Sequence, residues 1–183
     1  MAGATRSDQA LMAEVQAGSV RAFQALYDRH RQAVFAFLLR SLADRRAAED
    51  LLQEAFLRVF ARRQHYRPTA TFKTWLFTIA RNLVIDQLRQ QSGRQGFERG
   101  EILETVADPG ATPLQQAEAR ELGERLQAAV LRLPPSQREV LLLSRFAGLS
   151  HDEIAEVTGT SPGAVRVTLH RALRRLREGL RSM

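Results

Sequence analysis

The sequence contains no cysteine, so the chain itself can form no disulfide, no thiolate metal site and no thiol redox sensor. It has no apolar run near the roughly 18 residues that a membrane span needs, and its first residues lack the apolar stretch of a signal peptide. No segment alternates polar and apolar residues for long enough to indicate a strand. We therefore expect an all-α, cytoplasmic protein that makes no use of a membrane.

Lysine is almost absent, because Lys73 is the only lysine among 27 basic residues. Against 20 acidic residues this leaves a net charge of +7, which favours a polyanionic partner. The histidines are scattered, and no nucleophile, metal or phosphate-loop motif accompanies them. We expect no catalytic residue, no metal site and no cofactor, so an enzyme is the least favoured class of function.

Apolar residues recur at helical intervals in four stretches, residues 19–43, 44–63, 71–90 and 114–133. Between Ser92 and Pro113 the sequence has four glycines, two prolines and little periodicity, which is typical of a flexible linker. We therefore predict two small helical domains, residues 1–92 and 114–183, joined by a linker over residues 93–113. After Pro134 and Pro135, Ser136 and Glu139 have the spacing of a capping box that would begin another helix.

Residues 150–180 have the start and stop signals of a helix-turn-helix. Ser150 and Glu153 fit a capping box, and Ser161 followed by Pro162 supplies an N-cap and a proline at the first helical position. Gly159 lies between the two helices, where the chain needs a left-handed residue. These signals do not depend on charge, and together they predict the compact helix pair that many DNA-binding proteins place in the major groove.

The second helix of this pair has an apolar stripe on one side and a basic face on the other. The basic face contains Gly163, Arg166, Val167, His170, Arg174, Arg177 and Arg181. Arginine on such a face can donate a fork of hydrogen bonds to guanine or bind phosphate. The alternative is an ordinary solvated basic face.

The stretch 71–90 also has two dissimilar sides. We expect its polar side to contain Thr74, Thr78, Arg81, Asn82, Asp86 and Arg89, with Trp75 at the edge. An aromatic ring beside amide and guanidinium groups suits the stacking and reading of unpaired bases. Alternatively, Trp75 is a core residue whose indole N–H is satisfied.

In the stretch 44–63 an acidic and apolar stripe stands out. Asp50, Gln53, Glu54 and Leu57 are spaced so that they share one helical face. Two carboxylates could suggest catalysis or a metal, but no histidine partner accompanies them. We favour a docking face for a basic protein partner over a merely solvated face.

Three segments, Ala48–Phe60, Thr71–Arg89 and Leu133–Leu176, closely resemble bacterial RNA polymerase sigma factors of the extracytoplasmic-function (ECF) type. The motifs occur in the family's order and cover nearly all of the chain from about Ser19. The resemblance implies two helical domains, sigma regions 2 and 4, and a protein that recruits polymerase to promoters and melts the DNA. A helix-turn-helix regulator that binds duplex DNA without polymerase is the alternative.

The resemblance also implies a role for each group of residues. The stripe Asp50, Gln53, Glu54 and Leu57 would dock on the clamp helices of the polymerase β′ subunit. The minus-ten element would be captured by Trp75, Asn82, Asp86 and Arg89, with the preceding loop 67–72, and Asn82 would read a base. The minus-thirty-five element would be read by Arg166, Val167, Thr168, His170, Arg171 and Arg174.

Two further expectations follow from the resemblance. Partners would be core RNA polymerase, through its β′ clamp helices and β flap, promoter DNA and, as a hypothesis, an anti-sigma protein. The family often has Ser and Arg where this chain has Val167 and Thr168, so no relative's promoter preference carries over.

Overall fold

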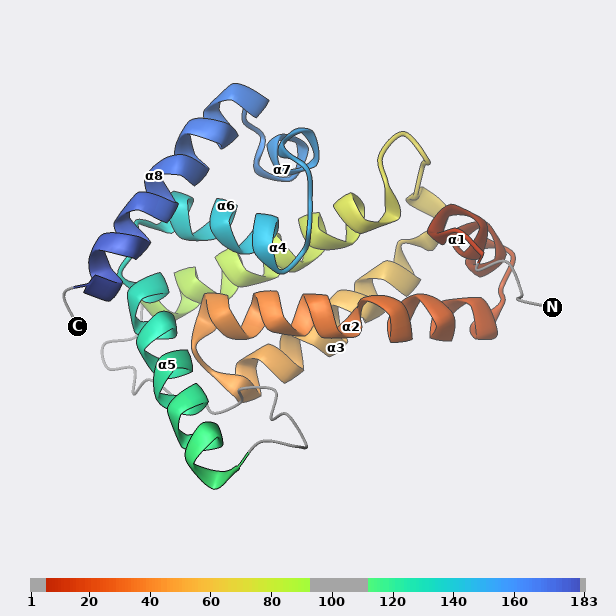
Figure 1. Ribbon diagram of the computed structural model, residues 1–183. Coiled ribbons are helices and arrows are strands. Elements are labelled where there is room, and N and C mark those ends of the chain that lie inside the picture. The colour runs from red at the N-terminus through yellow and green to blue at the C-terminus, as the bar shows by residue number, and fades with distance from the viewer. Residues whose placement is uncertain (1–5, 93–111, 182–183) are drawn as a thin grey trace.

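The computed structural model describes residues 6–92 and 112–181, and within these ranges every regular element is a helix (Figure 1). The elements are α1 (Asp8–Gln16), α2 (Val20–Leu42), α3 (Arg45–Ala61), the short 3₁₀ helix η1 (Arg63–His65), α4 (Phe72–Ser92), α5 (Pro113–Leu131), α6 (Pro135–Arg145), α7 (His151–Thr158) and α8 (Pro162–Arg181). The all-α prediction is confirmed.

Helix α2 lies at the centre of the molecule, where it contacts α1, α3, α4, α5 and α6 (Figure 1). Its side chains Leu26, Val34, Phe37 and Leu38 are all at most 1% exposed. Burying one such side chain stabilises the fold by about 1.5–3 kcal/mol, so this helix is the main scaffold on which the others pack.

The two predicted halves of the chain pack directly against each other. Helices α5 and α6 contact α2, and α7 contacts α4, so the buried side chains form one continuous cluster. Most of the predicted linker, residues 93–111, lies outside the described residues. The predicted domain boundaries therefore remain a prediction, while the close packing of the halves is a new finding.

Two helix boundaries test the reading of the sequence. The predicted break at residues 43 and 44 coincides with Ala43 in a left-handed conformation and with Asp44 capping α3 through the N–H of Ala47 at 3.0 Å. The predicted Ser136/Glu139 capping box was wrong, because α6 begins earlier, at Pro135, with Pro134 at its N-cap. The first turn thus already includes Ser136, whose hydroxyl makes no capping bond.

Helix α1 was not predicted, although its signals are present in the sequence. Ser7 accepts a hydrogen bond from the N–H of Ala10, and Leu11, Met12 and Val15 form one buried face. Nine residues do not form a stable helix in water, so α1 depends on packing against α2 and α4.

A partly buried polar pair attaches α1 to α2. The imidazole Nε2 of His30 lies 2.7 Å from the carboxylate of Asp8, which also pairs with Arg29. Burial lowers the pKa of His30 below its ordinary 6.5, and Asp8 opposes this shift only in part. The neutral imidazole therefore donates its Nε2–H to Asp8 in the folded protein.

This pair predicts a stability change in mild acid. The unfolded chain takes up the His30 proton near pH 6.5, whereas the folded protein does so only at lower pH, so stability is lost as pH falls below 6.5. His30→Gln, which keeps a donor for Asp8, should flatten this dependence in urea titrations between pH 7.5 and 5. The exposed His65, changed to Gln, is the control and should leave it intact. If the free energy of unfolding changed equally with pH in wild type and His30→Gln, the assignment to His30 would be contradicted.

Candidate nucleic-acid interface

The helix-turn-helix forms as its cap signals predict. The N–H of Glu153 donates to Ser150 Oγ at 3.3 Å, and the N–H of Ser150 donates to the Glu153 carboxylate at 2.9 Å. Gly159 has a φ of 69°, so a side chain there would be strained although the space around it is open. The prediction of both caps and of the turn is confirmed.

Helix α8 is held by one apolar side and presents the other to solvent. Ser161 Oγ accepts the N–H of Ala164 at 3.2 Å, so the predicted N-cap before Pro162 is confirmed. Val165 and Ala172 are at most 1% exposed and face the α6 and α7 side, which α8 contacts. The rigid attachment leaves the opposite face free along its length.

That free face carries five of the six residues predicted to read the minus-thirty-five element. They line one shallow, open hollow of about 510 Å³, formed by Arg166, Val167, His170, Arg171 and Arg174. Val167 is 49% exposed, which is unusual for an apolar side chain and suits contact with a thymine methyl group. Thr168 is half-buried and does not line the hollow.

The outer side of α4 differs in part from the predicted polar face. Asn82, Asp86 and Arg89 are exposed, as expected from their spacing. The placement of Thr74 on the polar face was wrong, because its side chain is buried under the second half of the chain. Arg81 is also partly covered and forms an ion pair with Glu139 of α6 at 2.7 Å.

Trp75 is half-buried in an aromatic cluster at the start of α4. Its ring centroid lies 5.2 Å from that of Tyr66 and 6.2 Å from that of Phe72. Trp75 is thus packed on one side and remains partly accessible on the other. Sequence reasoning missed Tyr66, although its aromatic ring precedes Phe72 and Trp75 in the loop segment and could have been noticed.

The predicted stripe on α3 lies on the surface, except for one member. Asp50 and Gln53 are exposed, and Leu57 is 64% exposed, a large apolar exposure on an acidic face. Glu54 is half-buried and accepts a hydrogen bond from Arg58 at 2.7 Å. The stripe therefore offers charge, an amide and an uncovered leucine to a partner.

The structure reveals a contact between the two predicted DNA-reading parts. The Glu153 carboxylate of α7 accepts hydrogen bonds from the hydroxyls of Thr71 at 3.0 Å and Thr74 at 3.3 Å. Burial raises the pKa of Glu153, but the hydrogen bonds from Ser150, Thr71 and Thr74 outweigh it and hold that pKa below 4.5. The ammonium of Lys73 adds a longer bond, 3.4 Å, to the carbonyl of Gly148.

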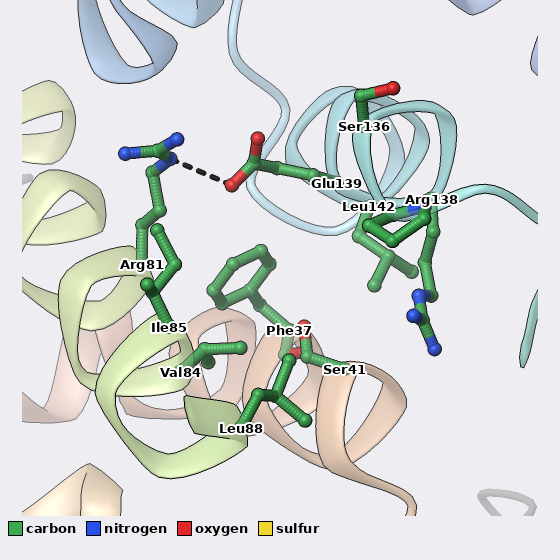
Figure 2. A pocket seen from close by; sticks show the side chains of 11 residues that line it. Phe37, Ser41, Arg81, Val84, Ile85, Leu88, Ser136, Arg138, Glu139 and Leu142 are labelled. Carbon is green, nitrogen blue, oxygen red and sulfur yellow. Dashed lines mark hydrogen bonds and ion pairs between the residues drawn. The ribbon is translucent and has the colours of Figure 1, made fainter. Parts of the chain in front are cut away.

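A cavity of about 260 Å³ lies between α2, α4 and α6. Figure 2 shows Phe37 and Leu142 facing it from α2 and α6, and the Arg81–Glu139 ion pair bridging it at one side. Between the lining residues Phe37 and Ser41 of α2, the side chain of Arg40 lies over the ring of Phe146, 4.6 Å from its centroid. Polar and cation–π contacts thus surround the apolar junction of the two halves.

Within residues 6–92 and 112–181, no group of three or more His, Cys, Asp or Glu side chains is placed to hold a metal ion. None of the helices in those ranges is both long and apolar enough to cross a membrane.

Known proteins match both halves of the chain. Residues 26–94 match the family model for sigma-70 region 2, and residues 123–176 match that for sigma-70, region 4. The sigma factor CarQ of Myxococcus xanthus is 38% identical over 161 residues, which is 88% of this chain and 90% of that protein. The ECF sigma factor SigW of Bacillus subtilis is 31% identical over 180 residues, which covers 93% of this chain and 95% of that protein.

A solved structure supports the same assignment. The sigma factor RpoE of Bartonella quintana, in complex with the anti-sigma factor NepR, aligns with a TM-score of 0.72 and 26% identity over 88% of this chain and 98% of that one. The helical fold and the two matched regions therefore define a sigma factor of the sigma-70 class. Within that class the chain belongs to the ECF-type sigma factors, which direct promoter-specific transcription and are not enzymes.

The hollow on α8 predicts a base contact. If Arg171 donates to a base edge, Arg171→Ala should cost about 1–3 kcal/mol of binding and relax specificity at one promoter position. The matched control is Arg181→Ala in the last turn of α8, outside the hollow, which should at most reduce the salt dependence. Binding to a library of duplex promoters measures both effects. Unchanged transcription and sequence preference in Arg171→Ala would contradict the base contact.

Proposed function

We propose that this sigma factor docks on core polymerase through the α3 stripe, captures the minus-ten element with α4 and its preceding loop, and reads the minus-thirty-five element with α8. The observation that carries the proposal is that the residues of these three surfaces are mostly exposed, on α3, α4 and α8. The residues are Asp50, Gln53, Glu54 and Leu57 for polymerase, Trp75, Asn82, Asp86 and Arg89 for the minus-ten element, and Arg166, Val167, Thr168, His170, Arg171 and Arg174 for the minus-thirty-five element.

The chemistry of each surface supports its assignment. Exposed Leu57 beside carboxylates provides an apolar anchor within an acidic rim, which is how protein interfaces combine affinity and orientation. Trp75 offers a ring for stacking, and Asn82 an amide that can pair with a base edge. The basic hollow on α8 suits the major groove, where arginine distinguishes guanine from the other bases.

Polymerase, promoter DNA and the cytoplasm follow as partners and location in this proposal. Because both DNA contacts belong to one bound complex, they act as a linked pair with a high effective concentration. An anti-sigma protein is a further proposed partner, since the RpoE relative was solved in complex with one. The second candidate, a duplex-binding regulator that acts without polymerase, leaves the exposed stripe on α3 without a role.

The α3 stripe supplies the test of this function. Gln53→Ala combined with Glu54→Ala should weaken binding to core polymerase and reduce transcription from a promoter library, because both changes lie on the proposed docking face. Glu49→Ala is the matched control, since Glu49 is exposed on α3 but outside the stripe and pairs with Arg45 at 2.8 Å. Affinity for labelled core and sequencing of transcript starts provide the measurements. Failure of the wild-type protein with active core to give defined starts would refute the proposal.

The same proposal requires the chain to open on a promoter. The two elements lie about 25 base pairs apart, or about 85 Å along the duplex. A compact chain of 183 residues has a radius of gyration of about 16 Å. One closed molecule cannot reach both elements, so the contacts of Glu153 and of the Arg81–Glu139 pair must break when both are read.

Fluorescence resonance energy transfer between two dyes measures this opening directly. Because the sequence has no native cysteine, thiol-reactive dyes attach only to the two cysteines that are introduced. Dyes on Ala61→Cys in α3 and Glu156→Cys in α7 should give high transfer in the free protein and low transfer with core polymerase and promoter. Glu139→Gln weakens a half-buried ion pair and should lower the transfer of the free protein. Equal transfer in the free and promoter-bound states would rule out the opening.

A further inference from the structure

The end of α1 and the segment after α3 are joined by a reciprocal pair of glutamines. The side-chain amide of Gln16 donates to the carbonyl of Arg63 at 2.9 Å and to that of Tyr66 at 3.1 Å. In return, the side-chain amide of Gln64 donates to the carbonyl of Gln16 at 2.8 Å. These three bonds connect residues 47 to 50 positions apart in the chain.

These bonds go to carbonyls at the ends of helical segments. The carbonyls of Arg63 and Tyr66 each accept a second hydrogen bond, from the N–H of Tyr66 and from Arg67, both at 3.2 Å. The Gln16 carbonyl belongs to the last turn of α1, where no following helical N–H is available. The carbonyls of Arg63 and Tyr66 belong to the short 3₁₀ turn and its end. Removing the half-buried Gln16 amide would leave each of these two carbonyls with one hydrogen bond instead of two, and would break two of the three bonds that join the end of α1 to this segment.

The reciprocal bonds of Gln16 and Gln64, here called the clamp, are attached to the centre of the fold through α1. Asp8, at the other end of α1, binds His30 and Arg29 of α2. Between these ends, Leu11 and Met12 are at most 1% exposed. Gln16 therefore extends from a fixed helix, and its position is set by the packing of α1 rather than by the loop it holds.

The clamp controls the loop that leads into α4. Its acceptor Tyr66 is 4% exposed, packs its ring against Trp75 and donates its hydroxyl to the carbonyl of Ala70 at 3.3 Å. Arg67 donates to the carbonyls of Gln64 at 2.8 Å and Tyr66 at 3.2 Å. The loop 67–71 is thus bonded to Tyr66 near both ends, through Arg67 and through Ala70. Gln16 in turn binds the backbone carbonyl of Tyr66.

We propose that Gln16, together with Gln64, is a positioning residue for promoter opening, which holds the loop 67–71 and Trp75 in the shape that captures an unstacked base. The inference rests on the proposed capture of the minus-ten element. Gln16 acts through Tyr66 and does not itself touch DNA. Holding the loop in its binding shape before the DNA arrives removes the entropy cost of ordering it upon capture.

The experiment measures capture by the complete complex of sigma factor and core polymerase. The probe is a fluorescent single strand carrying the non-template minus-ten sequence of a promoter that the library transcription selects. Gln16→Met, which keeps the length of the side chain but removes the donor, should weaken binding of this strand roughly tenfold. Gln16→Glu keeps the shape and places a carboxylate against two carbonyls, so it should weaken binding at least as much.

Two further variants separate positioning from general damage. Gln64→Met removes one of the three bonds and should weaken capture by a smaller factor, about two- to fivefold. Gln24→Met removes an exposed amide whose bond is to Asp28 within α2, and should leave capture unchanged. All four variants should keep wild-type affinity, to within about a factor of two, for core polymerase and for a duplex minus-thirty-five probe. Their melting temperatures should stay within a few degrees of the wild-type value.

The outcomes are distinct. Loss of strand capture with intact core and duplex binding supports the positioning role. Wild-type capture by both Gln16 variants overturns it, and so does an equal loss of capture, core binding and duplex binding, because that pattern indicates misfolding. If the Gln16 variants do not fold, unchanged capture by Gln64→Met overturns it. A wild-type complex that binds no single strand contradicts the proposed function as well as this inference.

Discussion

Burial of the apolar face of helix α2 is the constraint on which the rest of this structure depends. Five other helices contact it, and its apolar side chains join the cores of both halves of the chain. Neither half has a sheet or a disulfide to stabilise it within the described residues, so each relies on packing against α2. The surfaces proposed to contact partners lie on α3, α4 and α8, where most of the proposed residues are exposed.

The carboxylate of Glu153 serves two structural purposes at once. Glu153 completes the cap of α7 and also accepts hydrogen bonds from Thr71 and Thr74, next to the start of α4. The cap is local and survives if the halves separate, whereas the contact with the threonines does not. Because the capping bonds alone satisfy one carboxylate oxygen, opening leaves Glu153 able to exchange its threonine partners for water. The helix-turn-helix can thus leave α4 without unfolding.

Much of the local structure could be predicted from the sequence, because caps and amphipathic stripes are local patterns. Ser150, Gly159 and Ser161 marked the helix-turn-helix correctly, since each acts within its own turn. The prediction for Thr74 was wrong because a helical wheel cannot show that a distant helix covers part of a polar face. Contacts such as Gln16 with Tyr66 also lack any periodic signal, since they join single residues far apart in sequence. The closed arrangement and the support of the loop therefore required the structure.

Two junctions differ in chemistry: the Gln16–Gln64 clamp is neutral, whereas the junction between the two halves contains an ion pair. The proposed function requires the first to hold and the second to open. The clamp of α1 on the loop consists of neutral amides and carbonyls, whose hydrogen bonds salt screens far less than an ion pair. The junction proposed to open contains the Arg81–Glu139 ion pair, and Arg81 precedes Asn82 directly in the sequence. Under the proposed function, a DNA strand bound by Asn82 would offer phosphates to Arg81 and repel Glu139. Such competition would weaken the closed form, while the loop proposed to capture the base would keep its support.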